Sequence, residues 1–193
     1  NTMDGGNGFD TVSYQFTSRG VSVSLANAGL AVVPPGTNVL DSFIGVEGLI
    51  GTQFADTLMG DGANNVIEGL GGNDTIDGGL GMDMVSYRSV SNGKGVTVNL
   101  AVSTQGNTAA LAGTDTLLNI EGVIGTINAD TLTGNALDNT FQGLGGNDTI
   151  NGGAGNDTVS YADATNSVII NLAVTGAQNN NSAGVGTDVL SLV

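Results

Sequence analysis

The chain has 193 residues and is strongly acidic, with 18 Asp and Glu residues against three Lys and Arg residues and a formal net charge of −15. This balance favours cations as partners over nucleic acid or anionic lipid. The sequence contains no Cys and no His, which excludes thiol nucleophiles, disulfides, His-based catalytic triads and zinc sites built from nitrogen and sulfur. Apolar residues make up 39%, enough for an extended core. We therefore expect a folded chain that is not an enzyme.

A pentapeptide recurs along the chain at nearly constant spacing. Asp10-Thr11-Val12-Ser13-Tyr14 returns, with one substitution, at positions 83–87 and again unchanged at positions 157–161. This spacing predicts two long repeats, residues 10–82 and 83–156, and a partial third at 157–193. Because the last repeat stops partway through the pattern, we expect the chain to be a piece of a longer polypeptide.

Each long repeat begins with an insert that contains few glycines, at about residues 11–46, 84–120 and 158–193. Apolar and polar residues alternate at 21–25, 96–100 and 168–172, which predicts longer strands there, with loops near Pro34-Pro35 and at 179–181. From Asp10 to Glu47, and again from Asp83 to Glu121, the chain advances by little more than two coils of eighteen residues. We therefore expect residues 1–193 to form one continuous domain.

A nine-residue step follows each insert. An Asp or Asn occupies every ninth position, and an apolar residue follows each of them two places later. A unit with a six-residue glycine-rich turn and a three-residue strand is too short for a helix, and its single apolar side chain can only point inward. The pattern predicts an all-β fold, a parallel β-solenoid. The polar positions are Asp56, Asn65, Asp74, Asp83, Asp130, Asn139, Asp148 and Asp157.

Residues eighteen apart are expected to stack on the same edge of such a solenoid. Two carboxylates about 4 Å apart repel by roughly 4 kcal/mol at an effective dielectric near 20, and a divalent cation between them reverses the sign. Carboxylates, amides and free carbonyls of the glycine turns are all oxygen donors, which suits Ca²⁺ better than Mg²⁺ or a transition metal. The turn preference of Asp and Asn does not by itself explain the fixed spacing. The sequence therefore predicts several Ca²⁺ ions.

Three turns read Gly-Gly-x-Gly-x-Asp, at residues 5–10, 78–83 and 152–157. They resemble the RTX (repeats-in-toxin) calcium-binding nonapeptide. The resemblance implies a right-handed parallel β-roll in which the last Asp of each turn, and the carbonyls at its first and third positions, bind Ca²⁺ shared with the next turn on that edge. Asp10 matches this register, but its same-edge neighbour would precede Asn1. The implied carbonyl ligands are Gly69, Gly71, Gly78, Leu80, Gly143, Gly145, Gly152 and Ala154.

The nonapeptides depart from this pattern at two kinds of turn. Asn65 and Asn139 replace the final Asp, so we expect weaker sites there for lack of one charge. The turns that end at Asp56 and Asp130 keep a single glycine, and we expect the Asp56/Asp74 and Asp130/Asp148 sites to be occupied but less regular. Tyr14, Tyr87 and Tyr161 recur once per long repeat and favour a packed ladder over a ligand-stacking row.

The order of insert, residues 119–123 and nonapeptides also resembles the C-terminal β-roll of serralysin-type proteases, modules of alginate epimerases, and surface-layer and adhesin repeats. This resemblance implies a Ca²⁺-stabilised extracellular structural segment, of stalk, adhesin or surface-layer type, within a larger bacterial protein exported by type I secretion. The alternative is an accessory RTX module of a secreted protease, lipase, or polysaccharide epimerase or lyase. Besides calcium ions, neighbouring copies or cell-surface polysaccharide are candidate partners; nucleic acid binding and membrane insertion are not expected.

Overall fold

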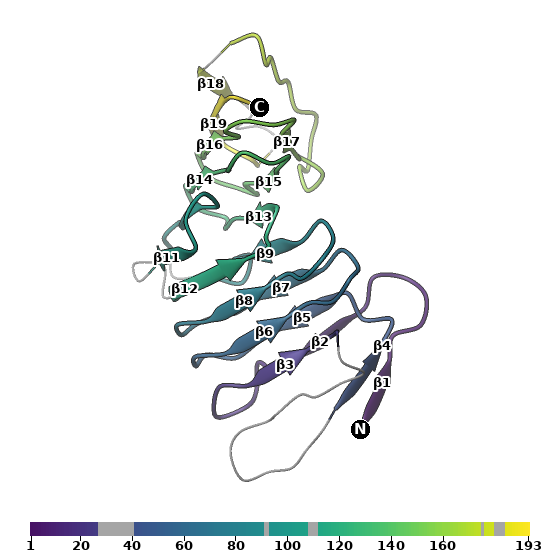
Figure 1. Cartoon of the computed structure of the whole chain (residues 1–193). Coiled ribbons are helices and arrows are strands. Elements are labelled where there is room, and N and C mark those ends of the chain that lie inside the picture. The colour runs from purple at the N-terminus through teal and green to yellow at the C-terminus, as the bar shows by residue number, and fades with distance from the viewer. Residues whose placement is uncertain (27–40, 91–92, 108–111, 175, 180–183) are drawn as a thin grey trace.

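The computed structural model describes residues 1–26, 41–90, 93–107, 112–174, 176–179 and 184–193. Within these ranges the chain forms short strands and turns and no helix, so the predicted all-β class is confirmed, and no helix that could cross a membrane is found there. The strands lie side by side in a stack that begins at the N-terminal end and finishes near the C-terminus (Figure 1). Pro34, Pro35, Asn180 and Asn181, where loops were predicted, lie outside the described residues.

A seven-stranded parallel sheet, which we name the long sheet, runs through most of the stack. Where nonapeptides follow one another, each strand pairs with the second strand after it, as β7 does with β9 through Val66 and Met84. This arrangement agrees with two nonapeptides per coil and is consistent with a parallel β-roll. In spatial order the strands are β2 (Thr11–Ser13), β5 (Gly48–Ile50), β7 (Val66–Glu68), β9 (Met84–Ser86), β13 (Gly122–Ile124), β15 (Thr140–Gln142) and β17 (Thr158–Val159).

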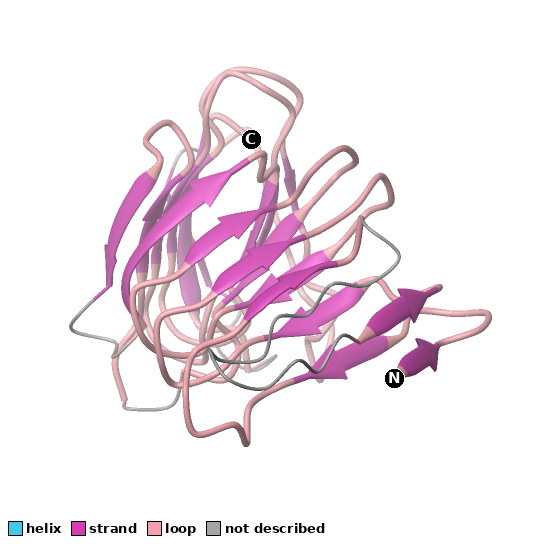
Figure 2. Ribbon diagram, turned by 60° about the horizontal axis from the view of Figure 1, so that its bottom comes forward, coloured by secondary structure: helices cyan, strands magenta, loops and turns pink. Residues whose placement is uncertain are grey.

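The strands that alternate with these in the chain belong to three further sheets (Figure 2). Among the described residues, strand pairings are parallel except for two antiparallel ones, β11 with β12 and β18 with β19. The first sheet pairs β1 (Thr2–Asp4) with β4 (Ser42–Ile44). The second contains β3 (Ser22–Ser24), β6 (Thr57–Met59), β8 (Thr75–Asp77), β12 (Gly113–Leu118) and β11 (Thr104–Asn107), and the third contains β10 (Thr97–Asn99), β14 (Thr131–Thr133), β16 (Thr149–Asn151), β19 (Thr187–Ser191) and β18 (Gly176–Asn179).

The core is a ladder of apolar side chains at the middle position of the three-residue strands. Leu58, Ile67 and Phe141 are each 0% exposed, because the middle side chain of a strand points to the opposite face from its two neighbours. Burying one such side chain contributes about 1.5–3 kcal/mol. The inward-pointing ladder predicted from the nine-residue step is therefore present. Its members also include Leu49, Ile76, Val85, Val98, Val123, Leu132 and Ile150.

Each of the first two inserts makes a single step along the long sheet, so the prediction of two coils of eighteen residues is wrong. Thr11 pairs directly with Gly48, and Met84 with Gly122, whereas two coils would place another strand between them. The strands of the second insert instead join the other sheets, where β12 pairs back with β8 and β10 pairs forward with β14. The first insert repeats this, with β4 on β1 and β3 on β6.

The longer strands predicted within the inserts are shorter than expected. The strands β3 and β10 have three residues each, although the flanking Val21, Leu25 and Val96 are buried. Residues 168–172 form no strand, so that prediction is wrong for the third insert. Ile169 and Leu172 are exposed there.

Candidate metal centre

The glycine turns fold each Asp side chain back over the first residue of its own turn. In the turn at residues 69–74, a Cβ on Gly69 would overlap Oδ2 of Asp74. Leu70 and Gly72 have φ angles of 71° and 118°, in the left-handed region that glycine adopts most readily. The turn at residues 143–148 repeats this geometry, since Gly143 has the same contact with Asp148. The backbone therefore leaves room for the carboxylate only because the first position has no side chain.

The predicted stacking of residues eighteen apart is present as hydrogen bonds. Oδ1 of Asp74 accepts the backbone N–H of Asp56 at 2.9 Å, and Oδ1 of Asp83 accepts that of Asn65 at 2.7 Å. The same bonds join Asp148 to the N–H of Asp130 at 2.9 Å and Asp157 to the N–H of Asn139 at 2.8 Å. One oxygen of each carboxylate therefore fixes the turn to its neighbour on the same edge.

In all four of these side chains, and also in Asp10, the Oδ2 oxygen is buried and unpartnered among the described residues. Buried polar atoms are normally hydrogen-bonded, and an ionised oxygen without a partner is costly. Each of the five residues ends a turn that contains three glycines. A bound cation would supply the partner that such an oxygen lacks. The atoms, which have no hydrogen-bond partner among the described residues, are Oδ2 of Asp10, Asp74, Asp83, Asp148 and Asp157.

The raised pKa values of two of these carboxyl groups also favour a cation at these turns. Burial raises the pKa of Asp74 to about 8, and the nearby charges of Asp115 and Asp56 add to the effect. Burial likewise raises the pKa of Asp148 to about 8, and the charges of Asp130 and Asp188 act in the same direction, against the hydrogen bond from the Asp130 N–H. A metal-free turn therefore favours the protonated carboxyl group, whereas a divalent cation would favour the ionised form.

A cation at these oxygens would need backbone carbonyls for most of its remaining ligands. The described residues contain no cluster of three or more Asp or Glu side chains able to hold a metal. The Gly78 carbonyl approaches Gly60 of the preceding same-edge turn so closely that a Cβ on Gly60 would overlap it. The N–H of Leu80 donates to Asp61 O at 2.9 Å. The backbone N–H groups of Gly71, Gly145 and Ala154 likewise donate to the carbonyl oxygens of Thr52, Thr126 and Asn135. The Gly152 carbonyl approaches Gly134 as the Gly78 carbonyl approaches Gly60.

Asp56 and Asp130 differ from the other aspartates because both of their oxygens are already used. Asp56 Oδ2 accepts the N–H of Thr52 at 2.6 Å, and Oδ1 accepts the Thr52 hydroxyl at 3.0 Å and the N–H of Val21 at 2.7 Å. Asp130 has the same three bonds, from Thr126 and Val96. At these two sites the unpartnered oxygen therefore belongs to Asp74 or Asp148 alone.

The carbonyl oxygen and the NH2 group of Asn65 and of Asn139 are each hydrogen-bonded as well. Asn65 Oδ1 accepts the N–H of Asp61 at 2.8 Å, and its amide donates to Glu47 O at 3.3 Å. Asn139 makes the equivalent bonds. Where the other turns have a carboxylate, these two turns have an amide that donates directly to a backbone carbonyl of the neighbouring turn.

Glu47 and Glu121 lie beside two of the predicted ligands, Asp10 and Asp83. From the sequence they served only to mark the ends of the inserts, and no contact with a ligand was predicted for them. Glu47 Oε2 accepts the N–H of Asp10 at 3.1 Å, and Glu121 Oε2 accepts that of Asp83 at 3.0 Å. Glu47 is therefore the following same-edge neighbour of Asp10, as Glu121 is of Asp83. Glu-Gly-apolar at 47–49 and 121–123 is the signal that identifies both.

Three further aspartates were missed altogether: Asp41, Asp115 and Asp188. Asp115 Oδ1 accepts the N–H of Asp74 at 3.1 Å, and Asp188 Oδ1 accepts that of Asp148 at 2.9 Å, so both extend the ladder beyond the nonapeptides. The three recur once per long repeat, and each precedes an apolar residue by two places, so the repeat pattern does contain them. Each also accepts a tyrosine hydroxyl, from Tyr14, Tyr87 or Tyr161.

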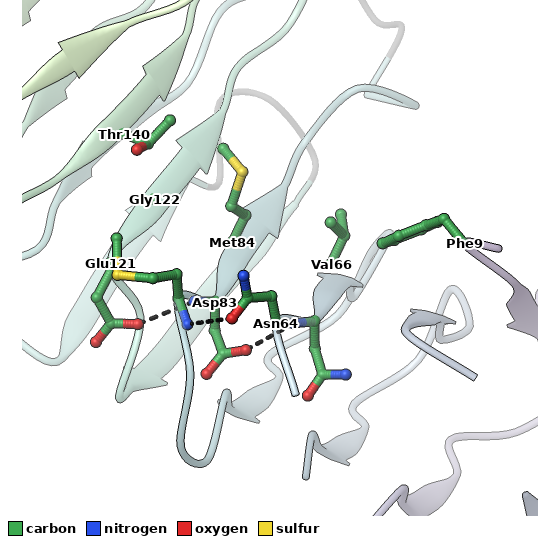
Figure 3. A pocket seen from close by; sticks show the side chains of 10 residues that line it. Phe9, Asn64, Val66, Asp83, Met84, Glu121, Gly122 and Thr140 are labelled. Carbon is green, nitrogen blue, oxygen red and sulfur yellow. Dashed lines mark hydrogen bonds between the residues drawn. The ribbon is translucent and has the colours of Figure 1, made fainter. Parts of the chain in front are cut away.

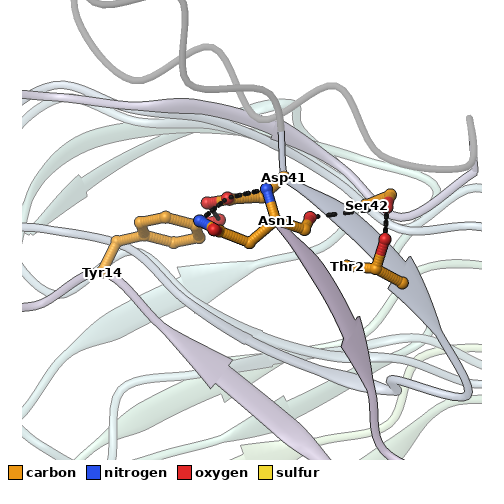
Figure 4. Close-up of polar contacts among 5 residues, drawn as sticks. All are labelled: Asn1, Thr2, Tyr14, Asp41 and Ser42. Atoms are coloured by element: carbon orange, nitrogen blue, oxygen red, sulfur yellow. Dashed lines mark hydrogen bonds and ion pairs between the residues drawn. The ribbon is translucent and has the colours of Figure 1, made fainter.

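Figure 4 shows the first of these tyrosine pairs. The Tyr14 hydroxyl donates to Asp41 Oδ2 at 3.0 Å, while the side chain of Asn1 donates to Oδ1 at 2.9 Å. Thr2 and Ser42 are hydrogen-bonded beside them, at 3.0 Å between their hydroxyl oxygens. Tyr14 and Tyr87 are buried, in agreement with a packed ladder. The aspartate that accepts each hydroxyl was not predicted from the sequence.

Replacing Tyr87 by phenylalanine is expected to lower the free energy of unfolding by about 2 kcal/mol, because it leaves Asp115 Oδ2 buried without its donor. Urea unfolding in saturating Ca²⁺ measures the change. Ser42→Ala removes a hydroxyl from an exposed pair and should change the value by less than about 0.5 kcal/mol. Equal stability of Tyr87→Phe and the unchanged chain would contradict a stabilising role for this bond.

Comparison with known families supports the same assignment. Residues 50–85 and 124–159 match the RTX calcium-binding nonapeptide repeat (four copies), and no curated protein matches the chain. The matched segments contain the turns that end at Asp74, Asp83, Asp148 and Asp157, with their four unpartnered oxygens. Repeats of this family are structural calcium-binding modules and are not catalytic. The two segments therefore belong to the RTX calcium-binding nonapeptide repeats, and the chain carries a calcium-binding repeat module of the kind found in secreted proteins.

Proposed function

We propose that this chain is a Ca²⁺-stabilised extracellular structural segment, of stalk, adhesin or surface-layer type, within a larger protein exported by type I secretion. The observation that supports this best is the set of five buried, unpartnered aspartate oxygens. In this proposal Ca²⁺ binds those oxygens together with the first- and third-position carbonyls of the same turns. Asp56, Asp130, Asn65 and Asn139 contribute through their contacts with the neighbouring carboxylates.

The proposed mechanism uses the charge of the chain as a folding switch. With a net charge of −15, the metal-free chain resists compaction through self-repulsion. A ligand that binds only the folded state stabilises it by about 2.7 kcal/mol per site at a hundredfold excess over its dissociation constant. Extracellular Ca²⁺ would therefore fold a chain that is loosely structured where Ca²⁺ is scarce.

A structural role follows from how stability is distributed in a stack of repeats. Each coil contacts only its neighbours, so stability adds along the stack and the folded segment is stiff. We infer that residues 1–193 form one continuous right-handed β-roll, in which the inserts add strands without interrupting the long sheet. Such a segment suits a spacer or surface layer, with neighbouring copies or cell-surface polysaccharide as its contacts.

The proposal is tested by measuring metal content and folding together. After gel filtration in buffer with Ca²⁺, mass spectrometry should find several Ca²⁺ ions per chain, and far-UV circular dichroism should show a β spectrum that is lost on chelation. The same protocol with Mg²⁺ should give neither result, because Mg²⁺ demands a stricter octahedral geometry. A chain that keeps its β spectrum in chelator and retains no Ca²⁺ would overturn the proposal.

A further inference from the structure

Asp115 resembles the aspartates of the glycine turns in one carboxylate oxygen and differs from them in the other. Its Oδ1 accepts the N–H of Asp74 at 3.1 Å, as Oδ1 of Asp74 accepts the N–H of Asp56 at 2.9 Å. Oδ2 of Asp74 is buried without a partner among the described residues, whereas Oδ2 of Asp115 accepts the Tyr87 hydroxyl at 3.1 Å. A tyrosine hydroxyl therefore gives Asp115 the partner that Asp74 would gain only from a bound cation.

The strand that carries Asp115, β12, lies along the turn that ends at Asp74. The N–H of Thr114 donates to Asn73 Oδ1 at 2.9 Å, and the N–H of Thr116 donates to Asp74 O at 2.7 Å. Together with the bond to Asp115, these contacts hold both the N–H and the carbonyl of Asp74. The strand therefore fixes the backbone that carries the unpartnered carboxylate oxygen.

The same arrangement occurs a second time, at the turn that ends at Asp148. Oδ1 of Asp188, in β19, accepts the N–H of Asp148 at 2.9 Å, and the N–H of Val189 donates to Asp148 O at 2.7 Å. Oδ2 of Asp188 accepts the Tyr161 hydroxyl at 2.9 Å, while Oδ2 of Asp148 has no partner among the described residues. Each of these two turns is thus held by an insert aspartate, which is held in turn by one tyrosine.

The Tyr87 hydroxyl has no ready replacement. Tyr87 and Asp115 are 3% and 2% exposed, and the nearest glutamate along the chain, Glu121, is already bonded to the N–H of Asp83 at 3.0 Å through Oε2 (Figure 3). A buried carboxylate oxygen without a donor is costly. Without the hydroxyl, Asp115 would leave its present orientation and release the N–H of Asp74.

We propose that Tyr87 is a positioning residue for the calcium site at Asp74, and that Tyr161 has the same role for the site at Asp148. Each hydroxyl holds the insert aspartate in the orientation that fixes the glycine turn, so that the turn retains its ion for longer. The inference rests on the proposed calcium function and goes beyond a general contribution to stability, because it assigns each tyrosine to one ion.

The test measures how fast the folded chain releases Ca²⁺ when it is mixed with a fluorescent chelator in a stopped-flow instrument. Tyr87→Phe is combined with Asp148→Asn, which leaves the Asp74 site intact, and separately with Asp74→Asn, which removes that site. In the Asp148→Asn background, Tyr87→Phe should speed the release of one ion about tenfold, which corresponds to about 1.4 kcal/mol. In the Asp74→Asn background, it should change the release of the remaining ions by less than about twofold.

Tyr161→Phe provides the reciprocal control, and it decides the question if Tyr87→Phe fails to fold. It should speed release in the Asp74→Asn background and leave release unchanged in the Asp148→Asn background. Equal acceleration in both backgrounds, or unchanged release from a variant whose stability in urea has fallen, would mean that the tyrosines only stabilise the fold, and would overturn the inference. Calcium content and circular dichroism are recorded for every variant, and a parent chain that binds no Ca²⁺ overturns the proposed function itself.

Discussion

Replacing both Asp74 and Asp148 by asparagine is expected to lower the free energy of unfolding in Ca²⁺ by about 5 kcal/mol, since two sites at a hundredfold excess of ligand contribute about 2.7 kcal/mol each. Each change removes the charged oxygen that lacks a protein partner and keeps the Oδ1 acceptor for the neighbouring N–H. At about 2–4 °C per kcal/mol for a chain of this size, thermal unfolding should shift down by about 10–20 °C.

The same double variant should behave in the opposite way without metal. Burial raises the pKa of both carboxyl groups, so an ionised Asp74 destabilises the metal-free fold and a neutral asparagine removes that penalty. Circular dichroism during thermal unfolding, with Ca²⁺ and with chelator, measures both signs. Asp138→Asn is the matched control, because this exposed residue keeps its Oδ1 bond to the N–H of Asn156. Equal destabilisation of the double variant in both buffers would mean that these aspartates stabilise through hydrogen bonds alone.

The nonapeptide part of the fold could be predicted from sequence because its period is short and strict. An apolar residue two places after each Asp or Asn identified the buried ladder, including Ile67 and Phe141, without any tertiary information. The same period fixed which turns share an edge, and the bonds from Asp56 to Asp74 and from Asn65 to Asp83 follow it. Local pattern and long-range pairing coincide here because every coil has the same length.

The inserts could not be predicted in this way because their pairing is not set by local period. Leu117 lies beside Ile76, and Val98 beside Leu132, so the two strands of one insert leave in opposite directions along the stack. A three-residue strand has the same alternation whichever neighbour it pairs with. The choice depends on which neighbouring coil offers an open edge, and residues 168–172, which show a similar pattern, form no strand.

The candidate site was predicted in its regular part and missed where other residue types take over. Asp115 and Glu121 do not fall on the nine-residue grid, although they recur with the long repeat. The role of Thr52 was invisible because a hydroxyl that closes a turn on Asp56 resembles any other polar turn residue. Thr126 stands in the same Gly-Thr context in the second long repeat, so a comparison of the two long repeats at every position would have identified both threonines.

Replacing Gly113 by alanine is expected to destabilise the folded state by about 3 kcal/mol or more. Its φ angle is 90°, and a Cβ there would overlap the carbonyl oxygen of Gly72. Both partners are backbone, so no flexible side chain can move aside. Urea unfolding in saturating Ca²⁺ measures the loss, with Gly186→Ala as an independent repeat, because Gly186 has the same overlap with the Gly146 carbonyl.

Two control glycines separate backbone strain from the close contact. Gly6 has a φ angle of 85° but open space around its Cβ position, so Gly6→Ala should cost only about 1–2 kcal/mol. Gly62 has open space without a positive φ, and Gly62→Ala should change stability by less than about 1 kcal/mol. A loss for Gly113→Ala no larger than that for Gly6→Ala would contradict the close packing of β12 on the turn at residues 69–74. Because Asp115 on that strand accepts the N–H of Asp74, Gly113→Ala should also weaken Ca²⁺ binding at this turn.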